Sequence, residues 1–312
     1  MKKLFILMMA AMPLFYACKK SNGDDSGKNP DQLAAAKKLQ KDVAGKWLMG
    51  NISLTSPNAF HNGIVTHTSS FKHIGRKTRP RQGNVAVTGL DDPGTGGTNT
   101  GYIEFLSDST YLIYDSEGHL FQGKFNAVTG DSISLGNFGS LGGIKLADNK
   151  LDFKLYYAAG AKTVVISGNK APAITADSRT ALLCRSWYLT NADNGGTIIG
   201  STSEYYNEST QQYESFTIDS LSFVITTSGT YIVQDFEKGI LKTADVANWR
   251  WHSSIANRFV YYWDDQPVNE DEDYIVIRDN TTEVLKLSEF YDDNGDNVTD
   301  EFKYLLLPAN SR

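Results

Sequence analysis

Residues 102–114 read YIEFLSDSTYLIY, and this stretch decides the fold class. Its two outer runs are rich in aromatic and β-branched residues, and Ser107-Asp108-Ser109 separates them. Aromatic and β-branched side chains suit the pleated, half-buried surface of a strand, whereas Ser and Asp favour turns. The stretch therefore predicts two short antiparallel strands joined by a tight turn.

The same pattern recurs through most of the chain. Similar runs, separated by Gly, Asn, Asp and Ser, stand at 151–156, 221–225, 230–233, 258–263, 274–278 and 302–307. Ahead of them, good helix formers dominate residues 31–43, with apolar residues at helical spacing. We therefore expect an all-β fold of antiparallel strands preceded by a short helix.

The two halves of the chain match each other in three places. The matched segments are 44–48 with 184–189, 105–111 with 225–231, and 148–155 with 279–287. In the first pair, Trp47 and Trp187 each open a strand after a short helical lead-in. Matches in one order indicate a duplicated domain, and Gly, Asn, Pro and Asp interrupt the strand pattern at 167–178. We expect β domains at 43–170 and 177–308.

Gly45-Lys46-Trp47 resembles the Gly-x-Trp signature of the lipocalin-like domains of Bacteroidota lipoproteins. The second half keeps Trp187 but has Arg185 in place of the glycine. The resemblance covers 43–308 as two tandem lipocalin-like copies. It implies two up-and-down antiparallel β-barrels of about eight strands each, whose interior can hold one small ligand.

The N-terminus has the features of a secretory signal peptide. A pair of lysines precedes an apolar run at 4–15, and a small residue and a cysteine follow at 17 and 18. A permanent membrane span needs about twenty apolar residues, so this run is too short to be one. Residues 15–18, FYAC, resemble a lipobox whose first two residues are bulkier than usual.

We therefore expect residues 1–17 to be removed and Cys18 to carry acyl chains such as palmitate. Two or three acyl chains would hold the protein on a membrane almost irreversibly, and the resemblance implies the outer membrane, on its periplasmic or its surface face. Residues 18–42 then comprise the lipidated cysteine, a polar tether and the short helix. The alternative is an ordinary secretory signal with an incidental cysteine.

Composition excludes some partners and some means of stabilisation. The formal net charge is -6, which argues against nucleic acid as a partner. The chain has only Cys18 and Cys184, and a lipidated Cys18 cannot form a disulfide. The fold must therefore be stabilised by packing.

Four aromatic residues are the candidate ligand-binding group. Trp249 and Trp251 lie two positions apart and share one face of a strand, and Tyr261 and Trp263 do the same further on. Flat rings suit sugar faces and apolar ligands, so these side chains could line one cavity. The alternative is that they fill the core, where aromatic side chains dominate packing.

Other polar groups give weaker signals. Basic residues gather at 72–81 and could bind an anionic glycan, a phosphate or a lipid headgroup, or could form a solvated loop. Acidic runs at 264–273 and 292–296 lack the spacing of an EF-hand and are better explained as soluble loops. Cys184 lies in an apolar lead-in, where its thiol should be inert. The sequence suggests no catalytic residue, metal ligand or cofactor.

The leading hypothesis is a lipid-anchored envelope protein that holds a small or oligomeric ligand, a glycan or an apolar molecule, in a β-barrel. The main alternative is a structural or interaction module with solid barrels, which contacts another envelope protein. A third hypothesis is an enzyme whose site is assembled from distant residues.

Replacing Cys18 tests the anchor. In Cys18→Ala the acceptor thiol is missing, so label from radioactive palmitate should disappear, together with the cleavage that depends on lipidation. Unchanged labelling of the variant in its native host would contradict the assignment of the anchor to this cysteine.

Overall fold

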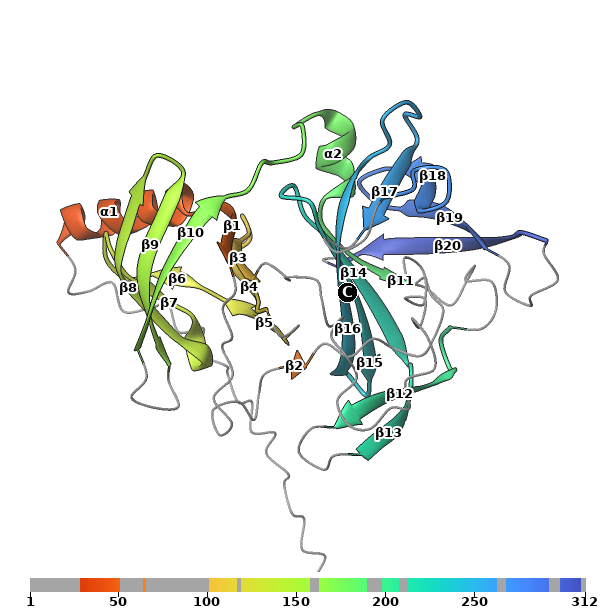
Figure 1. Ribbon diagram of the computed structural model, residues 1–312, viewed down its shortest axis with the longest axis horizontal. Coiled ribbons are helices and arrows are strands. Elements are labelled where there is room, and N and C mark those ends of the chain that lie inside the picture. Colours follow the sequence, from red (N-terminus) through yellow and green to blue (C-terminus); the bar gives the residue numbers. More distant parts are fainter. Residues whose placement is uncertain are drawn as a thin grey trace, which may run out of the picture.

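The computed structural model describes residues 29–50, 64–65, 101–116, 119–157, 163–189, 198–207, 212–262, 268–291 and 298–309. Most of them lie in antiparallel strands, and a short helix precedes the first strand of each half, so the predicted all-β fold is confirmed (Figure 1). Cys18 and the basic segment 72–81 lie outside the described residues. No helix in the described part of the chain is long and apolar enough to cross a membrane.

The first half is a helix followed by a curved sheet. Its elements are α1 (Pro30–Asp42), β1 (Gly45–Gly50), β2 (Ile64–Val65), β3 (Gly101–Phe105), β4 (Thr110–Tyr114), β5 (His119–Lys124), β6 (Asn126–Ala127), β7 (Ile133–Ser134), the short helix η1 (Gly136–Phe138), β8 (Gly139–Ala147), β9 (Lys150–Tyr157) and β10 (Thr163–Lys170). The strands form a 10-stranded sheet in the order β2-β5-β4-β3-β1-β10-β9-β8-β7-β6. This sheet curls almost closed around an apolar core (Figure 1).

The second half forms a closed barrel. Its elements are α2 (Ser178–Leu183), β11 (Ser186–Leu189), β12 (Thr202–Asn207), β13 (Gln212–Thr217), β14 (Ser220–Ile225), β15 (Thr230–Glu237), β16 (Ile240–Trp251), β17 (Arg258–Tyr262), β18 (Tyr274–Asn280), β19 (Leu285–Tyr291) and β20 (Asp300–Pro308). The barrel order is β11-β14-β15-β16-β17-β18-β19-β20, the expected up-and-down arrangement. β12 and β13, which follow β11 and precede β14 along the chain, pair only with each other among the described residues and form a separate hairpin.

Local sequence fixes where each helix begins. The Asn29 side chain accepts a hydrogen bond from the Asp31 N–H at 3.0 Å, and Pro30 occupies the first helical position of α1. At α2, the Asp177 carboxylate accepts from the Thr180 N–H at 2.6 Å. Such N-caps satisfy amide groups that have no partner within the helix. Both helices therefore begin where the sequence supplies a capping side chain.

The segments matched in the sequence occupy equivalent places in the two halves. β1 lies between β3 and β10, and β11 lies between β14 and β20. Trp47 donates its indole N–H to the Val43 carbonyl at 2.7 Å, and Trp187 donates to the Leu183 carbonyl at 2.9 Å. Both rings are buried. Each half thus ties the end of its helix to its first strand by the same hydrogen bond.

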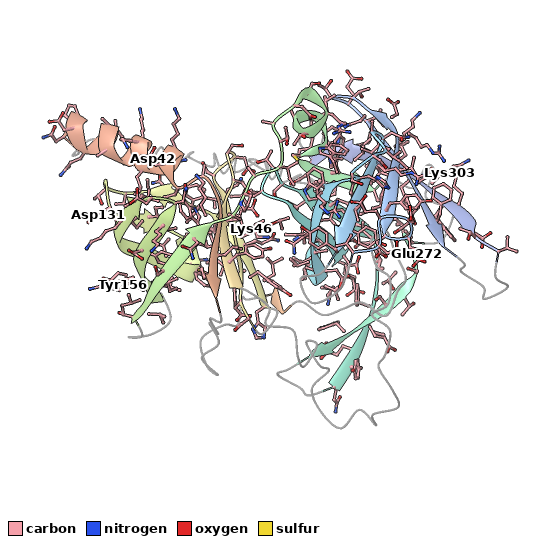
Figure 2. The ribbon with its side chains drawn as sticks, turned by 45° about the horizontal axis from the view of Figure 1, so that its top comes forward. Asp42, Lys46, Asp131, Tyr156, Glu272 and Lys303 are labelled. Carbon is pink, nitrogen blue, oxygen red and sulfur yellow. The ribbon has the colours of Figure 1, made fainter. Side chains whose placement is uncertain are left out.

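The two halves pack against each other through the outer faces of β3–β5 and β14–β16. A buried apolar cluster joins them, made of Tyr102, Leu112, Leu120, Val224, Ile232 and Ala244. Thr230 donates its hydroxyl to the fully buried Glu104 carboxylate at 2.7 Å. Lys46, which lies between the two halves in Figure 2, donates to the Asn248 side chain at 2.9 Å. Part of the outer faces of these strands is therefore buried as well as their inner faces.

The contribution of the Thr230–Glu104 hydrogen bond to the contact between the halves can be tested by comparison with a similar hydrogen bond inside the second barrel. In Thr230→Val, a buried carboxylate loses a donor, so the free energy of unfolding should fall by about 1–3 kcal/mol. Thr243→Val is the control, because Thr243 donates to the buried Asp235 carboxylate at the same 2.7 Å within the second barrel. Hydrogen exchange should show weaker protection of β3 only in Thr230→Val. Equal protection of β3 in both variants would mean that the halves are not coupled through this contact.

Candidate functional site

The second barrel has two ends that differ in chemistry. Segments 226–229 and 252–257 connect strands at the end covered by α2, which we call the helix end (Figure 1). The connection at 238–239 and the β12–β13 hairpin lie at the opposite end, which we call the hairpin end (Figure 1). Trp249 and Tyr261, two of the candidate aromatic residues, are direct cross-strand partners on β16 and β17.

The helix end is packed with large apolar side chains. Trp249 is fully buried, and its indole N–H donates to the Thr226 carbonyl at 2.9 Å. Its ring contacts the Phe259 ring edge to face, with the centroids 5.9 Å apart. Trp187 is buried in the same apolar cluster. The surroundings of Trp249 therefore favour a role in the core over contact with a ligand.

Trp251 contacts the helix. Its indole N–H donates to the Thr180 hydroxyl at 3.0 Å, and the Arg179 guanidinium lies 3.7 Å from the ring centroid. Its ring also meets the Trp249 ring edge to face at 5.4 Å. Trp251 is only partly buried and joins α2 to the barrel rim. Trp263, the fourth aromatic residue of the candidate group, lies outside the described residues.

The barrel interior also holds buried polar groups. Tyr261 points inward and its hydroxyl donates to the Glu289 carboxylate at 3.3 Å. Glu289 follows the inward-facing Leu285 and Leu287 at alternate positions of β19 and is 4% exposed. The Tyr304 ring is buried in the same cluster.

A second buried carboxylate lies on β15. Asp235 follows the inward-facing Tyr231 and Val233 at alternate positions, so its side chain faces the interior as well. It is fully buried and accepts from the Thr243 hydroxyl at 2.7 Å. The Tyr231 and Tyr261 ring centroids lie 6.2 Å apart. Tyr231, Tyr261 and Glu289 thus lie near one another in the interior, whereas Asp235 lies further along β15, toward the hairpin end.

Electrostatics keep the Tyr261 phenol protonated. Burial raises its pKa well above the usual value, and the negative charge of Glu289 raises it further. The hydroxyl therefore remains a hydrogen-bond donor at physiological pH. Another acceptor atom placed beside this hydroxyl could share its hydrogen bond with Glu289 or replace Glu289 as its partner.

The interior of the first barrel is different. Its buried cluster is made of aliphatic and aromatic side chains, including Phe105, Phe121 and Phe153. Among the described residues, this cluster contains one phenol, that of Tyr111. Its hydroxyl donates to the Leu135 carbonyl at 3.3 Å. Burial raises the pKa of Tyr111 to about 12. The carboxylate and phenol group is therefore a property of the second barrel.

The sequence pointed to Tyr261 but not to its polar neighbours. Residues 230–235, TYIVQD, are all buried, because one face of β15 lines the barrel and the other contacts the first half. Period-two alternation cannot show which face is inward when both are buried. The signal that could have found Asp235 is its spacing of four residues from Tyr231, which puts both side chains on the same face of β15. That signal becomes usable only once Tyr231 is known to face the barrel interior.

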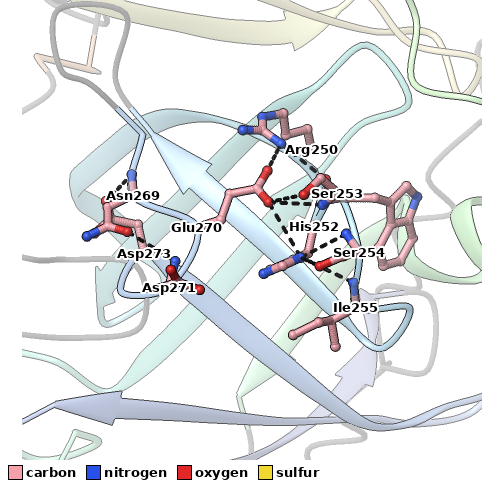
Figure 3. A network of polar contacts seen from close by, with 10 residues as sticks. Arg250, His252, Ser253, Ser254, Ile255, Asn269, Glu270, Asp271 and Asp273 are labelled. Atoms are coloured by element: carbon pink, nitrogen blue, oxygen red, sulfur yellow. Dashed lines mark hydrogen bonds and ion pairs between the residues drawn. The ribbon is translucent and has the colours of Figure 1, made fainter.

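A separate polar network surrounds Glu270 at the helix end (Figure 3). Glu270 accepts hydrogen bonds from Ser253 and pairs with Arg250, and these contacts lower its pKa to about 2. The His252 Nδ1 accepts from the Ser254 and Ile255 N–H groups at 3.1 and 3.2 Å.

This network does not have the geometry of a catalytic triad. A nucleophile and an orienting acid must bind different nitrogens of the histidine ring. Here Ser254 and Glu270 both face Nδ1 of His252, at 3.5 Å each. The network therefore stabilises the turn after β16. The described residues contain no group of three or more His, Cys, Asp or Glu side chains that could hold a metal ion.

The cysteine of the second half has the environment expected from its neighbours. Burial, with a smaller effect of the negative charge of Glu104, raises the pKa of the Cys184 thiol to about 12. The reactive thiolate is therefore scarce at neutral pH.

Truncating Trp249 separates its two possible roles. If the ring fills the core, Trp249→Ala should lower the free energy of unfolding by about 3–5 kcal/mol, because a large cavity remains. Trp251→Ala is the comparison, and should cost less because that ring is partly exposed. Chemical denaturation followed by circular dichroism measures both. A small loss for Trp249→Ala would restore the cavity-lining role.

Comparisons with known proteins add little. No protein-family model and no curated protein matches the chain. Among solved structures, the chain is similar to a protein of unknown function of the DUF3598 family from Nostoc punctiforme, with 11% identity and a TM-score of 0.19. The alignment covers 88% of this chain and 98% of that one. A similarity of this degree transfers neither a fold nor a function.

Proposed function

We propose that the protein is a lipid-anchored binding protein of the cell envelope, whose second barrel holds a small or oligomeric glycan. The observation that carries this proposal is the pairing of Tyr261 with the buried Glu289 inside the barrel. The anchor on Cys18 and the location at the outer membrane rest on the sequence alone.

Buried carboxylates are costly in a barrel that serves only as a scaffold. An ionised group loses its hydration on burial and is stable only with hydrogen-bond donors around it. Glu289 and Asp235 both lie inside the barrel, where apolar side chains would have been cheaper to bury. A ligand that donates hydrogen bonds would add to the donors that these carboxylates already have, Thr243 at Asp235 and Tyr261 at Glu289.

A glycan fits this chemistry better than an apolar molecule. Sugar hydroxyls donate to carboxylates, and sugar faces stack on aromatic rings such as those of Tyr231 and Tyr261. Ligand sites of this kind combine apolar walls with a few convergent polar groups. The packed helix end supplies a rigid floor, and Tyr261 and Glu289 supply polar groups in the interior.

A second candidate function is favoured by the first barrel. Its buried cluster is apolar, and its buried carboxylate Asp115 already pairs with the His119 side chain at 3.0 Å. We propose that this half is a structural module, which packs against the second barrel and can contact another envelope protein with its remaining surface.

Two substitutions in the second barrel test the ligand. Native mass spectrometry of protein purified from its own cells should show a co-purifying glycan mass. Glu289→Gln and Tyr261→Phe should each weaken binding of that glycan by about 10–100-fold, because a buried ligand hydroxyl loses its partner.

Tyr111→Phe is the matched control, since it removes a buried phenol hydroxyl from the first barrel. It should leave glycan binding unchanged in calorimetric titration. Wild-type affinity in both Glu289→Gln and Tyr261→Phe would overturn the site. Absence of any bound mass, together with no binding across a glycan array, would favour the structural module for the whole chain.

A further inference from the structure

The β12–β13 hairpin is attached to the second barrel differently from every barrel strand. β12 and β13 pair along their length, from Thr202 with Thr217 to Asn207 with Gln212. They share no strand ladder with the barrel in the described residues. The hairpin lies at the end of the barrel opposite α2 (Figure 1).

One face of the hairpin is buried against that end. Phe216 is 3% exposed and belongs to the same apolar cluster as Tyr261 and Tyr304. Its ring meets the Tyr205 ring edge to face at 5.9 Å. Glu204, on the opposite face of the hairpin, is exposed. The hairpin therefore covers the barrel interior with side chains and not with backbone hydrogen bonds.

A small polar group holds the hairpin to the turn between β15 and β16. The Glu237 carboxylate accepts from the Thr217 N–H at 3.1 Å and lies 3.3 Å from the Lys242 ammonium. The same ammonium lies 5.6 Å from the centroid of the Tyr205 ring. Lys242 and Glu237 thus bridge from the barrel to both hairpin strands.

The base of the hairpin has a residue suited to a hinge. Gly200 has φ +92°, a conformation that side-chain-bearing residues rarely adopt, and no heavy atom would lie within 4 Å of a Cβ at this position. Its N–H donates to the Ile218 carbonyl at 2.7 Å, which closes the base of the hairpin. The chain can therefore change direction here without a steric clash.

We propose that the β12–β13 hairpin is the gate of the second barrel, and that Glu237 and Lys242 form its latch. This inference rests on the proposed ligand site beside Tyr261 and Glu289. Opening exposes Phe216 and breaks the latch, but breaks no ladder between the hairpin and the barrel. A two-stranded hairpin is only marginally stable by itself, so the hairpin opens more readily than any barrel strand.

Hydrogen exchange of the full chain tests the gate without any ligand. Amides of β12 and β13 should exchange at least 100-fold faster than those of β15 and β16. Lys242→Met and Glu237→Gln should each speed exchange in the hairpin by about tenfold and leave β16 and β17 unchanged. Lys124→Met is the control, because Lys124 makes an ion pair with Asp108 at 3.1 Å in the first half, which is more exposed than the pair of Lys242 with Glu237.

Stopped-flow binding of N-phenyl-1-naphthylamine, an apolar fluorescent probe, tests access. Both latch variants should raise its association and dissociation rates by a similar factor of about tenfold, with Lys124→Met unchanged. Exchange in the hairpin as slow as in the barrel, or latch variants without effect on the exchange, would overturn the gate. Faster hairpin exchange with unaltered probe rates would overturn its role in access. If Glu289→Gln and Tyr261→Phe bind the glycan with wild-type affinity while the hairpin still exchanges fast, the result overturns the proposed ligand site and leaves the gate standing.

Discussion

The hydrogen bond from a buried tryptophan to the last turn of a helix organises both halves of this protein. Trp47 binds the Val43 carbonyl and Trp187 binds the Leu183 carbonyl, each from the first strand of its barrel. The contact satisfies a carbonyl that the helix itself leaves without a partner and places a large ring in the core. It therefore fixes each helix to the first strand of its half.

The sequence was informative where one side of a strand faces solvent or where a residue type is distinctive. The strands and the paired tryptophans were predicted from short patterns, and the structure places the matched segments at equivalent positions in the two halves. The polar neighbours of Tyr261 were not predicted. Asp235 lies on a strand buried on both faces, and Glu289 is 28 residues from Tyr261 along the chain. Contacts of that range depend on barrel closure, which no local pattern encodes.

The contact between the halves explains why the alternation fails on β15. Ile232 and Gln234 point away from the barrel interior, yet both are buried, because they meet the outer face of the first half. The Gln234 amide donates to the Gln122 side chain at 3.0 Å, and Thr230 donates to Glu104. Hydrogen bonds that must be satisfied on burial have a defined geometry, so these polar pairs fix the relative orientation of the halves more strictly than apolar contacts would.

The two halves differ in the polar groups that they bury. Both share the helix, the buried tryptophan and the strand order around it, so the requirements of folding are met in the same way by each. Each half also buries carboxylates, although buried charge stabilises a core less well than an apolar side chain of similar size. In the first half Asp115 pairs with the His119 imidazole at 3.0 Å, and in the second half Glu289 accepts from the Tyr261 hydroxyl at 3.3 Å. The same arrangement of strands thus carries different polar pairs, and this difference lies in the side chains and not in the fold.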